Sequence, residues 1–120
     1  MIFADGLFRG RQVLSAESVA LMTTDHLTDE QKQRCPAPEG WWQTRGWGMG
    51  ATVYVQSIPN GPSAGSYSWY GGYGGHFLFD KQRQIAIISQ IPRQARGAKD
   101  TSLGYQFELD TYRDIFGSES

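Results

Sequence analysis

The sequence predicts an α+β domain, with an antiparallel sheet of three or more strands packed against an N-terminal helix and a C-terminal helix. Residues 46–55 alternate between apolar and small or polar side chains, as expected for a half-buried strand. Residues 67–70, 74–79 and 84–90 indicate further strands; the apolar run Ile85–Ile88 suits a strand covered on both faces. The last segment places apolar side chains on one helical face ahead of Gly117: Tyr105, Leu109, Tyr112, Ile115 and Phe116.

Two capping signals place helices in the first third of the chain. Ser15 is a good N-cap for a helix over Ala16–Met22. Thr28 and Gln31 have the spacing of a capping box, which predicts a short polar helix ending near Arg34. Residues 1–12 are harder to assign, because two glycines interrupt a segment that could place apolar side chains on one helical face: Phe3, Leu7 and Phe8.

Composition indicates one domain over residues 1–120 and excludes some functions. Eleven basic and twelve acidic residues nearly cancel, so no global field favours nucleic acid or an anionic membrane surface. No apolar run approaches the roughly 20 residues that a membrane-spanning helix needs. The N-terminus lacks the pattern of a signal peptide, and a single cysteine, Cys35, forms no internal disulfide. We expect a soluble chain, and the sequence gives no cellular address.

The segment over residues 67–75 is unusual, because it holds four glycines and four aromatic residues. Glycine within a strand loses packing and entropy, so it often marks a bulge or a close approach to the backbone. Backbone amides freed of side chains can donate to a developing oxyanion in acyl transfer. A glycine bulge that only twists the sheet is the alternative, and the residues alone leave both interpretations open.

Other chemical candidates carry weaker signals. Ser68, His76 and Asp80 are the residue types of a hydrolase triad, but they lie on one predicted strand pair, where such residues rarely converge. Two histidines and one cysteine without metal-ligand spacing predict no metal site, and we expect no cofactor. The tryptophans suit either packing against the sheet or a platform for sugar rings and flat ligands: Trp41, Trp42, Trp47 and Trp69.

Three segments together resemble the C-terminal part of the superfamily of serine β-lactamases, penicillin-binding proteins and family VIII carboxylesterases. Arg11–Leu27 is similar to that superfamily's leucine-leucine-serine segment and following helix. Gly46–Gly50 is similar to its glycine-tryptophan-glycine-leucine-glycine strand. Trp69–Gly75, with Phe79 and Asp80 downstream, lies where it carries its third active-site motif. The resemblance covers nearly the whole chain and implies the fold of that C-terminal part.

The resemblance also implies roles for individual residues. Trp69, Tyr70 and Gly71 would form the third motif and line the substrate cleft on the edge-facing strand. Gly72 would supply one backbone amide of the oxyanion hole. Tyr73 would also contact substrate, and residues 73–75 would continue that strand. Trp69 replaces a lysine or histidine and Tyr70 a small hydroxyl residue, which favours a neutral ester or amide over an anionic β-lactam.

The catalytic serine of that superfamily has no counterpart in this chain. No serine is followed three residues later by lysine, and no tyrosine or serine has asparagine two residues on. The chain is therefore interpreted as the closing part of a serine hydrolase, inactive alone, whose partner is the N-terminal remainder. Without the N-terminal strands and helices that the resemblance implies, the sheet would keep an open edge and an apolar face, so self-association is expected. The alternative is an aromatic-rich ligand- or glycan-binding module.

Overall fold

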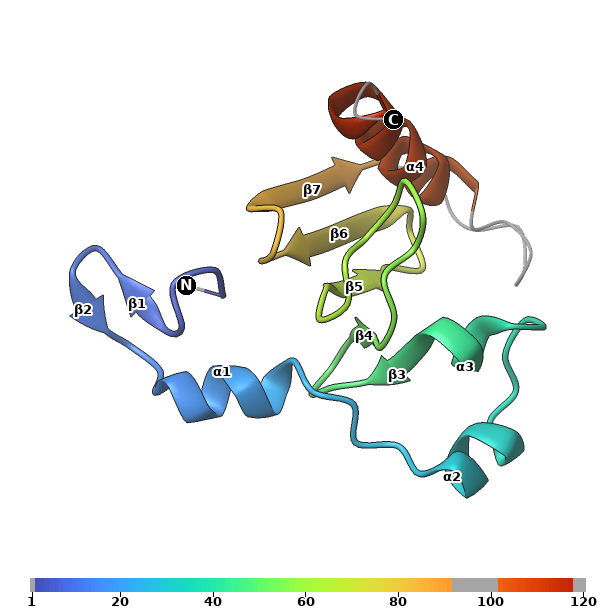
Figure 1. Ribbon diagram of the computed structural model, residues 1–120, viewed down its shortest axis with the longest axis horizontal. Coiled ribbons are helices and arrows are strands. Elements are labelled where there is room, and N and C mark those ends of the chain that lie inside the picture. The colour runs from blue at the N-terminus through green and yellow to red at the C-terminus, as the bar shows by residue number, and fades with distance from the viewer. Residues whose placement is uncertain (1, 92–101, 118–120) are drawn as a thin grey trace.

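The computed structural model describes residues 2–91 and 102–117 (Figure 1). Its helices and strands follow along the chain in this order: β1 (Leu7–Phe8), β2 (Arg11–Gln12), α1 (Ala16–Met22), α2 (Asp29–Arg34), α3 (Trp41–Thr44), β3 (Arg45–Trp47), β4 (Thr52–Tyr54), β5 (Tyr67–Tyr70), β6 (Gly75–Asp80), β7 (Ile85–Gln90) and α4 (Ser102–Phe116).

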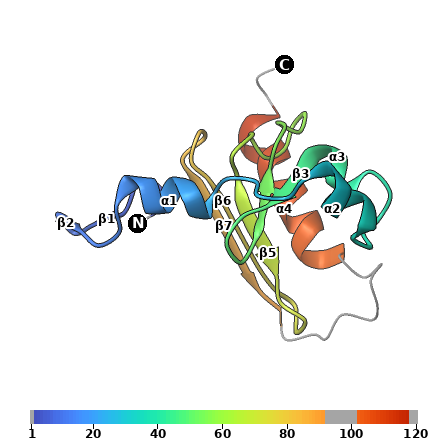
Figure 2. The same cartoon turned by 90° about the horizontal axis from the view of Figure 1, so that it is seen from below.

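Strands β3 to β7 form a five-stranded sheet in which each strand pairs antiparallel with its neighbour in sequence. Helix α4 packs on one face, and Figure 2 shows α2 and α3 on the same side of the sheet. Helix α1 and the β1–β2 hairpin project from the opposite side (Figure 2). The predicted α+β class, an antiparallel sheet packed with helices, is confirmed.

Successive strand residues point to opposite faces of the sheet and build two apolar clusters. On the α4 side, four side chains no more than 3% exposed pack together, with Phe116 beside them: Tyr54, Leu78, Ile87 and Tyr112. On the other side, Phe77 and Phe79 pack against three buried residues: Ala51, Val53 and Tyr67. Burying each large apolar side chain contributes about 1.5–3 kcal/mol, so the α4 contact stabilises the whole sheet.

Both predicted helix caps are confirmed. The Ser15 hydroxyl accepts a hydrogen bond from the Ser18 N–H at 3.1 Å, where α1 begins. At the start of α2, Thr28 Oγ1 accepts from the Gln31 N–H, and Gln31 Oε1 accepts from the Thr28 N–H. These short helices thus satisfy N-terminal donors that their own turns leave free.

Residues 46–55 do not form one strand, so that prediction was wrong. The chain reverses between β3 and β4, where the Gly48 N–H donates to the Ala51 carbonyl at 2.9 Å and Gly50 has a φ of +87°. Trp47 pairs with Thr52 across this hairpin. The alternation of apolar with small or polar side chains happens to continue through the turn. The glycines that permit the turn were therefore interpreted as strand residues.

Two other segments were not assigned from the sequence. Residues 7–12, where two glycines weakened a possible helical face, form a β-hairpin, because Arg9 and Gly10 both have positive φ angles, as a tight two-residue hairpin turn requires. Helix α3 was not predicted at all. It is a single turn that starts after Gly40, whose φ is +76°, and its sequence has no capping side chain to mark it.

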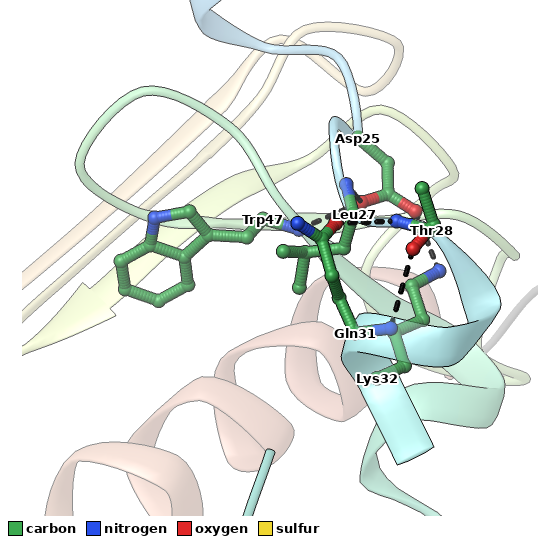
Figure 3. A network of polar contacts seen from close by, with 6 residues as sticks. All are labelled: Asp25, Leu27, Thr28, Gln31, Lys32 and Trp47. Atoms are coloured by element: carbon green, nitrogen blue, oxygen red, sulfur yellow. Dashed lines mark hydrogen bonds and ion pairs between the residues drawn. The ribbon is translucent and has the colours of Figure 1, made fainter. Parts of the chain in front are cut away.

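Gly46 of β3 makes room for Asp25, whose polar contacts Figure 3 shows. Its Oδ1 accepts from the backbone N–H groups of Leu27 and Trp47, both at 3.0 Å, and its Oδ2 lies 2.6 Å from Lys32 Nζ. Burial raises the pKa of Asp25, but these three donors outweigh it and lower that pKa below its ordinary value. A Cβ at Gly46 would lie 2.0 Å from the Asp25 Cγ, so glycine is needed there.

Among the residues that the structure describes, only one face of strand β7 is covered. Ile87 is 3% exposed beneath α4, whereas Ile88 on the opposite face is 60% exposed. The prediction of a strand covered on both faces therefore does not hold within residues 2–91 and 102–117. Within those ranges, no helix is long and apolar enough to cross a bilayer.

Candidate functional site

The glycine-aromatic segment forms the end of β5 and the turn into β6. The Gly71 N–H donates to the Gly75 carbonyl at 2.6 Å, the Gly74 N–H donates to the Gly71 carbonyl, and Gly74 has a φ of +86°. Residues 73–75 were expected to continue the strand, but β5 ends at Tyr70 and Gly75 begins β6. The glycines therefore build a tight reversal rather than a bulge within one strand.

The edge of β5 that faces β4 is open beyond Ser68 among the described residues. Strand β4 pairs with β5 only at Tyr67 and Ser68, so Trp69 and Tyr70 pair with β6 alone among the described residues. Backbone groups in an antiparallel ladder point alternately to either side. Because Gly71 bonds to Gly75 in β6, the backbone groups of Tyr70 point toward the open edge. Gly72 follows in the turn, beyond the end of the strand.

The backbone N–H of Gly72 has no hydrogen-bond acceptor among the residues that the structure describes. A Cβ built at Gly72 meets no atom within 4 Å, so the surrounding space is empty. A free donor beside open space has the accessibility that an oxyanion donor needs.

Trp69 and Tyr70 point to opposite faces of the sheet. Trp69 is 39% exposed and contacts Trp47 edge-on, with ring centroids 4.7 Å apart. Tyr70 stacks on His76 on the α4 side, with centroids 4.5 Å apart, and burial raises the pKa of its hydroxyl. Tyr73 at the turn is 77% exposed. Trp69, Gly72 and Tyr73 are thus accessible, whereas the Tyr70 ring is part of the packing beneath them.

Ser68, His76 and Asp80 do not form a triad. Ser68 Oγ does lie 3.3 Å from His76 Nε2, but the acid beside that same nitrogen is Glu108, with Oε2 at 3.0 Å. Asp80 instead accepts from the Ser63 N–H and the Tyr112 hydroxyl. A triad needs the acid on one ring nitrogen and the nucleophile on the other. Ser68 and His76 are also no more than 2% exposed, out of reach of substrate.

Glu108 was missed by sequence reasoning, although a signal for it existed. It lies three residues after Tyr105 and four before Tyr112, on the apolar stripe of the last helix. A carboxylate on a buried helical face is rarely found unless it is paired. Glu108 is completely buried, at 0% exposure, on the side of α4 that faces the sheet.

The four tryptophans do not form one platform. Trp47 and Trp69 contact each other beside the open edge, whereas Trp41 and Trp42 lie in α3. Arg45 stacks over Trp41 at 4.2 Å, and Trp42 Nε1 donates to the Cys35 carbonyl. The two α3 tryptophans help line a shallow depression of about 320 Å³ together with polar side chains: Asp29, Lys32, Gln33 and Gln43. Within the described part of the chain, no group of histidine, cysteine or acidic residues could hold a metal ion.

No family model matches the chain. Two curated proteins of Mycobacterium tuberculosis, the uncharacterized protein MT1414 and the protein Rv1367c, are each 36% identical to it over 96 residues. Each match covers 76% of this chain and 24% of the relative. The chain therefore spans about a quarter of the length of the curated relatives it matches.

Two solved structures share its fold. Simvastatin synthase (LovD) from Aspergillus terreus aligns with a TM-score of 0.68 and 16% identity, over 90% of this chain and 31% of that protein. EstCE1, described as a hydrolase with promiscuous acyltransferase activity, aligns with a TM-score of 0.59 and 20% identity, over 86% of this chain and 25% of that protein. These two likenesses show that the chain shares the fold of the aligned parts of both proteins.

Proposed function

We propose that the chain is the C-terminal part of a β-lactamase-like serine hydrolase that cleaves an ester or amide bond through an acyl-enzyme. Its contribution is one wall of the active site, formed by Trp69, Gly71, Gly72 and Tyr73, with the Tyr70 ring as packing beneath. The observation that carries this proposal is the Gly72 N–H in the β5–β6 turn, which has no acceptor among the described residues and lies beside the open part of the β5 edge. The fold likeness to a synthase and to a hydrolase with acyltransferase activity supports it.

The proposed chemistry needs a serine from the N-terminal remainder of the enzyme. Its oxygen would bond to the substrate's carbonyl carbon while the carbonyl electron pair moves onto the oxygen, where the Gly72 N–H donates to the resulting oxyanion. The pair then returns, the bond to the leaving group breaks, and the leaving group takes the proton that the serine hydroxyl gave up. Water hydrolyses the acyl-enzyme in the same way. Trp69 offers no positive charge to a substrate carboxylate, which favours a neutral ester or amide.

The 120-residue chain alone is expected to be inactive, because it carries no serine-x-x-lysine nucleophile. Hydrolysis of p-nitrophenyl acetate and nitrocefin should stay at the background rate in a spectrophotometric assay. The sequence immediately upstream of Met1 in the gene should encode such a motif in frame, and the longer polypeptide should hydrolyse the ester. Turnover by the chain alone that disappears in the Ser68→Ala variant would contradict the proposal.

We also propose that the chain associates with itself when the N-terminal remainder is absent. Within the described residues β7 pairs only with β6, and the sheet face opposite α4 leaves Ile88 exposed. Open strand edges and apolar faces favour pairing between chains. Light scattering at high protein concentration should give a mass above the 13.4 kDa of one chain. The Ile88→Lys variant should lower that mass, and a single-chain mass for the unmodified protein would rule the association out.

A further inference from the structure

A buried pair of polar side chains lies directly beneath the glycine turn. His76 is the second residue of β6 and is paired with Tyr70 of β5. Its ring stacks on the Tyr70 ring at an angle of 19°. Tyr70 is covalently joined to Gly71, and Gly72 follows. The position of the His76 ring therefore bears on the backbone that carries the Gly72 amide.

Glu108 of α4 fixes the His76 ring from the other side. Its Oε2 lies 3.0 Å from His76 Nε2, with side-chain exposures of 0% and 1%. Its Oε1 accepts from the Tyr54 hydroxyl at 3.1 Å, and that hydroxyl accepts from Arg45 at 3.0 Å. One carboxyl oxygen of Glu108 thus accepts a hydrogen bond and the other lies beside His76, so a connected set of polar contacts runs from Arg45 in β3 to His76 in β6.

The backbone of α4 comes close enough to make this contact because Gly104 faces His76. A Cβ at Gly104 would lie 2.9 Å from the His76 Cβ. Glu108 follows Gly104 by four residues, on the same face of the helix. Gly104 therefore lets α4 approach His76 closely, and Glu108 contacts the ring of the same residue.

Stability alone gives no reason for a buried histidine and a buried carboxyl group at this place. Burying polar groups costs free energy unless they are fully hydrogen-bonded, and well-packed apolar residues are often as stable or more so. Leu78 and Tyr112 beside it show that this interface accepts apolar packing. A pair that fixes one ring in one orientation gives specificity of geometry instead.

We propose that Glu108 and His76 are positioning residues for the Gly72 amide, acting through the Tyr70 ring. The inference rests on the function proposed above only for the use of that amide. Because neither side chain reaches the open edge, their effect on a substrate is indirect. Their effect on the turn can be measured without any substrate.

The test compares ¹⁵N NMR spectra of the 120-residue chain with those of Glu108→Gln and of the control Asp114→Asn. Both variants lose one negative charge on α4, but Asp114 is exposed. Glu108→Gln should shift the amide signals of Gly71, Gly72 and Gly74, move the His76 Nε2 proton signal, and raise hydrogen exchange at the Gly71 amide about tenfold. Asp114→Asn should leave all of these unchanged.

If Glu108→Gln fails to fold, Tyr54→Phe provides the milder change, because it removes only the donor to Oε1 and should produce smaller shifts at the same amides. Unchanged signals over residues 70–75, or a loss of stability spread evenly over the sheet, would overturn the proposal. If the turn responds as expected but the longer protein hydrolyses no ester, the proposed function fails and the positioning role stands.

Discussion

Replacing Gly72 with proline in the longer enzyme is expected to lower kcat about 10²–10³-fold, as the loss of one oxyanion-hole donor does in other acyl-transfer enzymes. Proline removes the Gly72 N–H, which has no acceptor among the described residues, and Gly71 before it tolerates the restriction that proline imposes. Because the oxyanion forms only in the transition state, KM for p-nitrophenyl acetate should change little. Steady-state kinetics on the ester measures both constants.

The matched control is Gly72→Ala, which keeps the N–H. Gly72 does not have a positive φ, and its added Cβ meets no atom within 4 Å, so the variant should fold normally. Its kcat should stay within about threefold of the parent enzyme, since the donor is intact. Equal losses of kcat in both variants would show that the side-chain space at residue 72 matters and that its amide does not.

Most of the helices and strands could be predicted from the sequence, because helix caps and apolar runs involve residues that are close together in the chain. The caps at Ser15 and Thr28 satisfy N–H groups three residues away. The strands at β5, β6 and β7 follow apolar runs that a sheet must bury. The β3–β4 turn was missed because the alternation of side chains continues through it. The reason for Gly46 in β3 was also not visible, because its partner is Asp25, some twenty residues earlier.

The candidate site was predictable only in part for the same physical reason. The segment 69–75 was recognisable from its glycines and aromatics, and the chain's resemblance gave it a role. The strand predicted over residues 67–70 is confirmed as β5. The resemblance continued it over residues 73–75, and the tight turn at Gly71–Gly74, which depends on backbone hydrogen bonds, prevents that. The partner of His76 comes from α4, 32 residues later in the chain, a distance over which spacing carries no information.

The Gly48→Ala substitution is expected to lower the free energy of unfolding of the 120-residue chain by about 3 kcal/mol. The added Cβ would lie 2.1 Å from the Met22 carbonyl oxygen and 3.0 Å from Val53 Cγ2. The Met22 oxygen cannot move freely, because it accepts from the Met49 N–H at 3.0 Å. The end of α1 must therefore separate from β3, or β3 must separate from the sheet.

Thermal unfolding followed by circular dichroism should show Tm lowered by roughly 10 °C for Gly48→Ala. The control is again Gly72→Ala, which adds the same methyl group in open space and should leave Tm within about 2 °C. This pair of alanine variants separates the two kinds of glycine in the chain. Gly48 is required by the backbone that packs against it, whereas a Cβ at Gly72 meets no packing contact. Equal Tm values for the two variants would refute the close approach between α1 and β3.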